Sequence, residues 1–180
     1  MSTITKNEQT EKEVATLIKE ADAIITNTLT KIKYETIIMY FNIGEMISKY
    51  KKENNAKHGD DVINTFIDKL SLKYGKGFNK SSVYYAIKFY NLFSNFPTWG
   101  NSINKKSQMS ELFRNVTWSH IRELLVLEEL VIFLFYIKEV SKKELTIKEI
   151  RYAMKSRSYE RTISNQKKNS HKPIEIKECV

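Results

Sequence analysis

The first fifty residues carry a helical repeat of apolar side chains, and this repeat constrains the fold more than any other feature of the sequence. The apolar positions lie three and four residues apart, as they do along one face of an α-helix. We therefore expect one long helix here, or two helices in series. The positions are Val14, Leu17, Ile18, Ala21, Ile24, Ile25, Leu29, Ile32, Ile37, Ile38, Phe41, Met46 and Ile47.

Turn residues are scarce throughout the chain. The 180 residues include five glycines and two prolines, too few for the many tight turns of a β-rich fold. The sequence therefore predicts an all-α protein. We expect three segments, namely a flexible N-terminus over residues 1–9, a helical domain over residues 10–162 and a polar, disordered tail over residues 163–180.

The middle of the chain reads as helix, short turn, helix. A polar loop at residues 51–59 should end the first helical stretch, with Gly59 as the stop and Asp60 as the next N-cap. A short amphipathic helix follows over residues 62–70, and the glycines of residues 74–78 (YGKGF) interrupt it. Asn79 or Ser81 can cap the helix after this turn. That helix has an apolar side, with Val83, Ala86, Ile87, Tyr90 and Phe93, and a polar side, with Lys80, Ser81, Tyr84, Lys88 and Asn91.

The C-terminal half should also be helical. Residues 95–110 lack periodicity and predict an exposed loop, after which Thr117 can cap a helix that runs to Leu127. The apolar run that ends at Val140 predicts a helix, with a buried strand as the alternative. Two capping boxes are possible beyond it, Ser141 with Glu144 and Thr146 with Glu149, and the second is the better start for a helix containing Ile147, Ile150, Ala153 and Met154.

Cysteine use and hydropathy indicate a cytoplasmic protein. Cys179 is the single cysteine, so no internal disulfide can form. The N-terminal residues are polar and mixed in charge, unlike a secretory signal. The longest apolar run covers residues 130–137, well short of the roughly 18–20 residues that cross a bilayer.

The positive charge of the chain is concentrated in two segments. The net charge is +9, but no acidic residue lies between Asp68 and Glu111, and residues 141–180 hold eleven basic residues against five acidic ones. A lysine-rich composition alone would raise the charge evenly along the chain. The uneven distribution favours a polyanionic partner.

The first basic segment supplies the main candidate site. In a helix-turn-helix protein, the start of the second helix needs short hydrogen-bond donors for base edges and cations for phosphates. The alternative is an ordinary solvated helix face that happens to be basic. The candidate nucleic-acid-binding residues are Lys76, Asn79, Lys80, Ser81, Ser82, Tyr84, Tyr85 and Lys88.

The second basic segment supplies further candidates, at spacings that place most of them on one side of a helix and its exit. These side chains could contact phosphates at a second place, or could simply end a helix favourably. The candidates are Lys148, Arg151 and Lys155, with Arg157 and Arg161 following them.

Catalytic and metal sites have little support. Ser119 and His120 are adjacent at a helix start, so their side chains diverge and cannot form a nucleophile and base pair. The three histidines, at positions 58, 120 and 171, are far apart, and no pair has ligand spacing. Residues 174–177 (IEIK) contain the Glu-x-Lys half of a nuclease motif at Glu175 and Lys177, but Asp68 is the last aspartate. We expect no catalytic residues, no metal and no cofactor.

Several strings resemble the N-terminal domain of the bacterial YhcG-like proteins, which are grouped with the PD-(D/E)xK nucleases. The match runs in order over roughly residues 30–162. Its pieces are residues 40–44 (YFNIG, like "YWEIG"), the helix at 62–71 with residues 77–83 (GFNKSSV, like "GFSxRNL"), residues 117–120 (TWSH, like "PWSH"), and residues 135–139 (FYIKE) through 145–150 (LTIKEI), like "FYIKEA…WSRREL".

The resemblance implies a helix-turn-helix or winged-helix-like module that precedes a nuclease domain in the family. The family's active site lies downstream of the matched region, so we expect no enzyme activity. Two departures matter. Val131, Ile132 and Phe133 replace a charged segment, which suggests a buried or interface helix, and residues 146–150 (TIKEI) lack the family's arginines, whose contacts are not carried over.

These observations predict a module that binds duplex DNA mainly through phosphates. The alternative is a protein-interaction module that docks on a nuclease or another partner through residues 130–140, which would then be an exposed apolar patch open also to homodimer formation. A third, weaker hypothesis is residual nuclease activity that uses Glu175.

Overall fold

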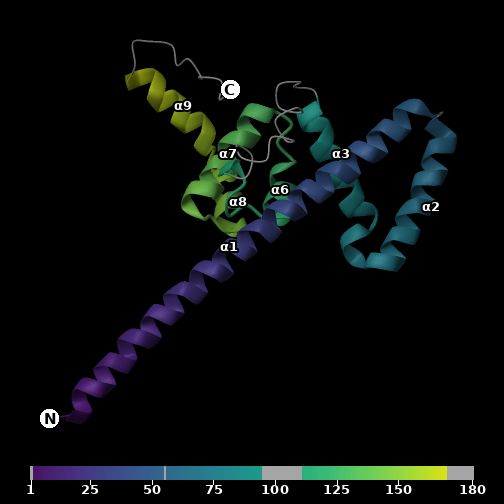
Figure 1. Cartoon of the computed structure of the whole chain (residues 1–180). Helices are drawn as coiled ribbons and strands as arrows, with labels where there is room; N and C mark the ends of the chain where they lie inside the picture. The colour runs from purple at the N-terminus through teal and green to yellow at the C-terminus, as the bar shows by residue number, and fades with distance from the viewer. Residues whose placement is uncertain (1, 55, 95–110, 170–180) are drawn as a thin grey trace.

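The computed structural model describes residues 2–54, 56–94 and 111–169, and within them the chain is all-helical, as predicted (Figure 1). No strand occurs in these ranges, so the wing of a winged-helix fold has no counterpart there. The elements are α1 (Ser2–Glu53), α2 (Ala56–Tyr74), the 3-10 turn η1 (Lys76–Phe78), α3 (Lys80–Ser94), α6 (Trp118–Leu124), α7 (Leu130–Lys143), α8 (Ile147–Lys155) and α9 (Ser158–Asn169).

Helix α1 is a single unbroken helix of 52 residues. Figure 1 shows its N-terminal half projecting away from the other helices, which gather on its C-terminal half. Every side chain from Glu8 to Leu29 is exposed, and the buried face begins at Tyr34. The predicted helix is therefore confirmed, but the first part of its apolar repeat is exposed and is not packed against any other helix that the structure describes.

The segment boundaries differ from those expected at both ends. Residues 2–9, expected to be a flexible N-terminus, belong to α1, and residues 163–169 of the expected tail belong to α9. The loop expected at 95–110 and residues 170–180 lie outside the described residues.

Helices α1 and α3 cross at Gly44, where their backbones approach so closely that a side chain does not fit between them. A Cβ atom built on Gly44 would lie 2.1 Å from the carbonyl oxygen of Ala86, far inside van der Waals contact. Ala86 itself is fully buried. Only a residue without a side chain lets the two backbones meet here.

The main core forms on the far side of this crossing, where α6, α7 and α8 pack against α1 and α3. Many of its rings meet edge to face, as Phe41 does with Phe89 at 5.6 Å between ring centroids, a geometry that adds to the area that the rings bury. The largest side chains under 2% exposed are Phe89, Phe93, Phe113, Phe133, Ile37, Ile121, Leu124, Leu125, Ile137 and Ile150.

A smaller cluster joins α1, α2 and α3 and holds the helix, turn, helix segment together. It consists of Ile47, Ile63, Ile67 and Val83. The turn begins at Gly75, whose φ of 86° favours glycine. The expected helix stop at Gly59 is wrong, because α2 already begins at Ala56 and runs through this glycine.

Hydroxyl caps start two of the C-terminal helices where the sequence predicted them. Thr117 caps α6 in a reciprocal box with His120, and Thr146 caps α8 in a box with Glu149. The predicted box at Ser141 is wrong, because α7 continues to Lys143 and the Ser141 hydroxyl instead donates to the carbonyl of Glu111 at 3.2 Å.

Helix α7 packs into the core, so residues 130–140 do not form the exposed apolar patch that the alternative docking hypothesis requires. Its buried residues are Leu130, Phe133, Tyr136, Ile137 and Val140. Val131 is the exposed large apolar side chain of this run. The apolar segment is a buried helix, because an amphipathic face that contacts a core on one side leaves no broad apolar patch on the other.

Replacing Gly44 with alanine should lower the free energy of unfolding by about 1–3 kcal/mol, because the new methyl group must displace the α3 backbone. Helix propensity alone would give the opposite sign, a gain of roughly 0.5–1 kcal/mol. Urea unfolding followed by circular dichroism measures the change. Asn42→Ala, at an exposed position of the same helix, is the matched control, and equal stability of the two variants would contradict the crossing.

Burial of His120 should make the fold sensitive to acid. Desolvation lowers the pKa of His120 below its ordinary value of 6.5; nearby Lys33 lowers it further, and a hydrogen bond with the Leu145 backbone partly offsets both. Below pH 6.5 the unfolded chain then binds more protons than the folded one, so stability falls as the pH decreases through this window and is unaffected above it.

His120→Gln keeps a side chain suited to the capping box but removes the titration. We expect the melting temperature of this variant to fall less between pH 7 and about pH 5 than that of the parent chain. An equal fall in both would mean that His120 does not carry the acid sensitivity. The other histidines are present in both chains, so their contribution cancels in the comparison.

Candidate nucleic-acid interface

Helix α3 has the two faces that its sequence predicts. Val83, Ala86 and Phe93 are buried against α1 and the core, and Phe89 is buried with them. The opposite side presents Lys80, Ser81, Tyr84, Lys88 and Asn91, of which Tyr84 is 60% exposed and Lys88 half-buried. A polar and basic stripe therefore runs along the accessible side of this helix.

Two of the predicted contact residues have structural roles instead. Ser82 is buried, with 6% of its surface exposed, so its prediction as a nucleic-acid contact is wrong. The side-chain oxygen of Asn79 accepts a hydrogen bond from the Ser82 backbone N–H at 2.9 Å, which makes Asn79 the N-cap of α3. Sequence reasoning could not separate these roles, because a polar residue at a helix start suits a cap and a ligand contact equally.

The lysines near the turn differ in their exposure and in whether an acidic side chain lies beside them. Lys76 in η1 and Lys80 at the start of α3 are exposed. Lys88, one turn after Tyr84, lies 3.9 Å from the carboxylate of Glu128. An acidic side chain from outside the segment thus lies beside the C-terminal part of the stripe, although the segment between Asp68 and Glu111 contains no acidic residue.

Tyr40 of α1 fixes the position of the turn. Its hydroxyl donates to the carbonyl of Gly77 at 2.8 Å, and its ring stacks on Trp118 of α6 with 4.1 Å between centroids. The ring also stacks on Phe78. Burial raises the pKa of Tyr40, an effect that nearby Arg122 partly opposes, so this tyrosine remains a neutral donor at physiological pH. One side chain therefore connects the long helix, the turn and α6.

Arg122 of α6 is the functional candidate that sequence reasoning missed. Its guanidinium lies over the ring of Tyr85, 4.9 Å from the centroid, and it is close enough to Tyr40 to influence the pKa of that hydroxyl. Arg122 is exposed. The only sequence signal was an arginine between the buried positions His120, Ile121 and Leu124 of α6, and its closeness to α3 arises from tertiary packing alone.

The second basic segment is joined to the first through α6. Arg151 of α8 makes a bidentate ion pair with Glu123, with nitrogen to oxygen distances of 2.8 and 2.7 Å. The hydrogen bond from Arg151 lowers the pKa of Glu123. Arg151 is thus engaged within the protein, which weakens its prediction as a phosphate contact, whereas Lys148 and Lys155 are exposed.

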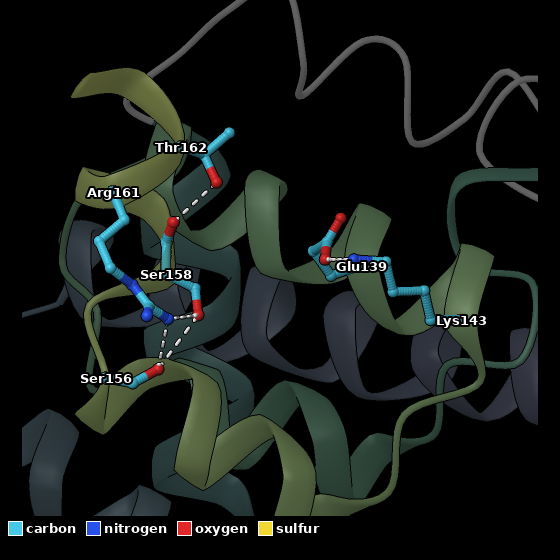
Figure 2. A network of polar contacts seen from close by, with 6 residues as sticks. All are labelled: Glu139, Lys143, Ser156, Ser158, Arg161 and Thr162. Carbon is cyan, nitrogen blue, oxygen red and sulfur yellow. Dashed lines mark hydrogen bonds and ion pairs between the residues drawn. The ribbon is translucent and has the colours of Figure 1, made fainter. Parts of the chain in front are cut away.

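The last basic residues of the segment lie where α8 meets α9. Figure 2 shows Arg161 donating to the hydroxyls of Ser156 and Ser158, at 3.0 and 3.2 Å, while Thr162 donates to the Ser158 carbonyl at 2.8 Å. The nearby pair of Glu139 and Lys143 lies within α7. Arg161 is therefore used to fix the start of α9.

The described residues form neither a metal site nor a membrane span. Among them, no three His, Cys, Asp or Glu side chains are grouped as metal ligands. None of the helices there combines the length and the apolarity that a bilayer crossing requires. The indole N–H of Trp118 is buried and has no acceptor within this part of the chain.

Comparison with known proteins gives one match. No curated protein and no solved structure matches the chain. The profile of the DUF1016 N-terminal domain matches residues 13–161, which covers α1 from Glu13 through α8 and the start of α9. The chain therefore belongs to the DUF1016 N-terminal domain family, which is the family of YhcG-like N-terminal domains.

Proposed function

We propose that this chain binds duplex DNA through α2, η1 and α3, which act as a helix-turn-helix-like module without a catalytic step. The observation that carries the proposal is the accessible stripe of α3, which joins Lys80, Ser81 and Tyr84 to the exposed Lys76 of the turn. Cations and short hydrogen-bond donors at the start of a second helix are what DNA recognition requires.

Contacts with phosphate oxygens dominate in the proposed complex. The segment from Lys69 to Ser94 contains five lysines and no acidic residue, so its field attracts a polyanion. Base edges would be reached by few side chains, since Ser82 is buried and Asn79 caps the helix. We therefore expect affinity that depends strongly on salt and weakly on sequence.

Arg122 extends the proposed surface from α3 to α6. The Arg122 guanidinium lies 4.9 Å from the centroid of the Tyr85 ring, and a guanidinium beside an aromatic ring can still donate hydrogen bonds to phosphate. Lys148 and Lys155 of α8 would contact the flanking backbone. The pairing of Arg151 with Glu123 means that α8 contributes fewer free charges than its sequence implies.

Charge reversal at the turn should abolish most of the binding. For Lys76→Glu with Lys80→Glu, we expect the affinity for a fluorescein-labelled 20-base-pair duplex to fall at least about tenfold at low salt. The slope of log K against log salt should become shallower by about 2. Fluorescence anisotropy titrations at several salt concentrations measure both quantities.

The control for this experiment is Lys138→Glu with Lys142→Glu, which makes the same charge change at exposed positions of α7. It should lose much less affinity, because only the general field of the protein changes. Equal losses in the two double variants would mean that the charge of the whole molecule drives binding. The α3 assignment would then be wrong.

Neutralising Glu123 should strengthen binding if α8 lies near the DNA. Glu123→Gln removes the charge that engages Arg151, so the guanidinium becomes available and the affinity should rise a few-fold, on the order of one added phosphate contact. Glu45→Gln, which releases Lys49 from the analogous pair on α1, is the control and should have little effect. If both variants behave alike, α8 is not part of the surface.

A further inference from the structure

An apolar seam runs along α1, on the side that no other element of the described residues covers. Side chains seven residues apart are exposed at every repeat, with exposed fractions between 37% and 56%. They are Ile18, Ile25, Ile32, Met39 and Met46. Isolated apolar residues on a surface are ordinary, but a strict seven-residue series over four repeats is the pattern of a coiled-coil seam.

A heptad seam has two apolar positions in each seven-residue repeat, and the projecting part of α1 has a second series of small side chains at the other position. They are Val14, Ala21 and Thr28, which lie four residues before Ile18, Ile25 and Ile32, the spacing that a heptad requires. The positions on either side of the seam are apolar too. They are Leu17, Ile24 and Leu29, and each is at least half exposed. The hydroxyl of Thr28 donates to the carbonyl of Ile24 at 2.9 Å, so this threonine can be buried without losing a hydrogen bond.

The seam faces away from the helical body. The α1 side chains that contact the body include Ile37, Phe41 and Ser48. At 100° per residue, these lie on the opposite side of the helix from Ile32, Met39 and Met46. Figure 1 shows that the other described helices gather on the C-terminal half of α1, so a second helix can lie along the seam of the projecting half without displacing any of them.

The projecting half of α1 also needs support that the described part of the chain does not supply. Residues 8–29 are exposed at every position, and a helix without tertiary contacts is marginal in water. This one contains four threonines and three isoleucines, which are weaker helix formers than alanine or leucine. Burial of the seam against another helix would provide the missing stabilisation.

We propose that the occupant of the seam is the same segment of a second copy of this chain, in antiparallel orientation. With the pair centred near residue 23, Val14 opposes Ile32, Ile18 opposes Thr28, and Ala21 opposes Ile25. Each layer then pairs one isoleucine with one smaller side chain, as antiparallel heptad packing requires. The contact from Val14 to Ile32 is about 27 Å long.

Charge complementarity supports the second copy and selects its orientation. Residues 11–22 carry four acidic side chains and two lysines, whereas residues 23–34 carry two lysines and no acidic side chain. In an antiparallel pair each acidic half lies beside the basic half of the other copy. A parallel pair would place like charges side by side, which disfavours it.

Sedimentation of the full chain at micromolar concentrations, without nucleic acid, tests the association. We expect a dimer, and we expect Ile18→Glu with Ile25→Glu to shift it to a monomer, with at least a tenfold increase in the dimer dissociation constant. These two side chains are exposed and belong to neither core cluster, so the variant should keep its core and its cooperative melting. Thr16→Glu with Ala23→Glu, at exposed positions on the opposite side of the same helix, is the matched control and should remain a dimer.

Disulfide trapping tests the orientation, in a background in which Cys179 is replaced by serine. Two differently tagged chains, one with Val14→Cys and the other with Ile32→Cys, should crosslink to each other after mixing and mild oxidation. Crosslinks of each chain only to itself would indicate a parallel pair and would overturn the proposal. A parent chain that stays monomeric at the highest concentration would overturn it too, since the seam would then belong to a different partner.

Discussion

The fold depends on the close crossing of α1 and α3 at Gly44. Because no side chain separates the helices there, the two backbones meet, and the space on either side is filled by the core around Phe89 and by the smaller cluster around Val83. The same crossing decides which side of α3 is accessible. The polar stripe that begins at Lys80 lies on the side of α3 that the crossing leaves accessible, and at its far end Asn91 accepts a hydrogen bond from the Ser48 hydroxyl of α1 at 3.3 Å.

Much of the fold could be predicted because local chemistry determines it. The three-and-four spacing of apolar residues predicted α1, and the hydroxyl and carboxylate at Thr146 and Glu149 predicted the start of α8. Errors arose where two local signals compete. Gly59 is a helix breaker by propensity, yet α2 passes through it, and Ser141 could cap a helix, yet α7 continues through it because its apolar face is already buried.

The candidate site was less predictable, because tertiary contacts decide its membership. The stripe on α3 follows from periodicity within one helix. The contributions of α6 and α8 depend on which residue meets which partner: Arg122 lies over Tyr85, while Arg151 is held by Glu123. Neither fact has a signal in the sequence, since the paired residues are separated by 28 or more positions.

The continuity of α1 has a mechanical consequence. Helices bend most readily at proline and glycine. Between Ser2 and Glu53 the sequence contains no proline, and Gly44 is its single glycine. At this position α1 packs directly against the backbone of Ala86, which restricts bending there. In the proposed pair, where a second helix supports its projecting half, α1 is therefore a rigid rod held at α3, and a force applied to that half is transmitted as torque to the helix that carries the basic stripe.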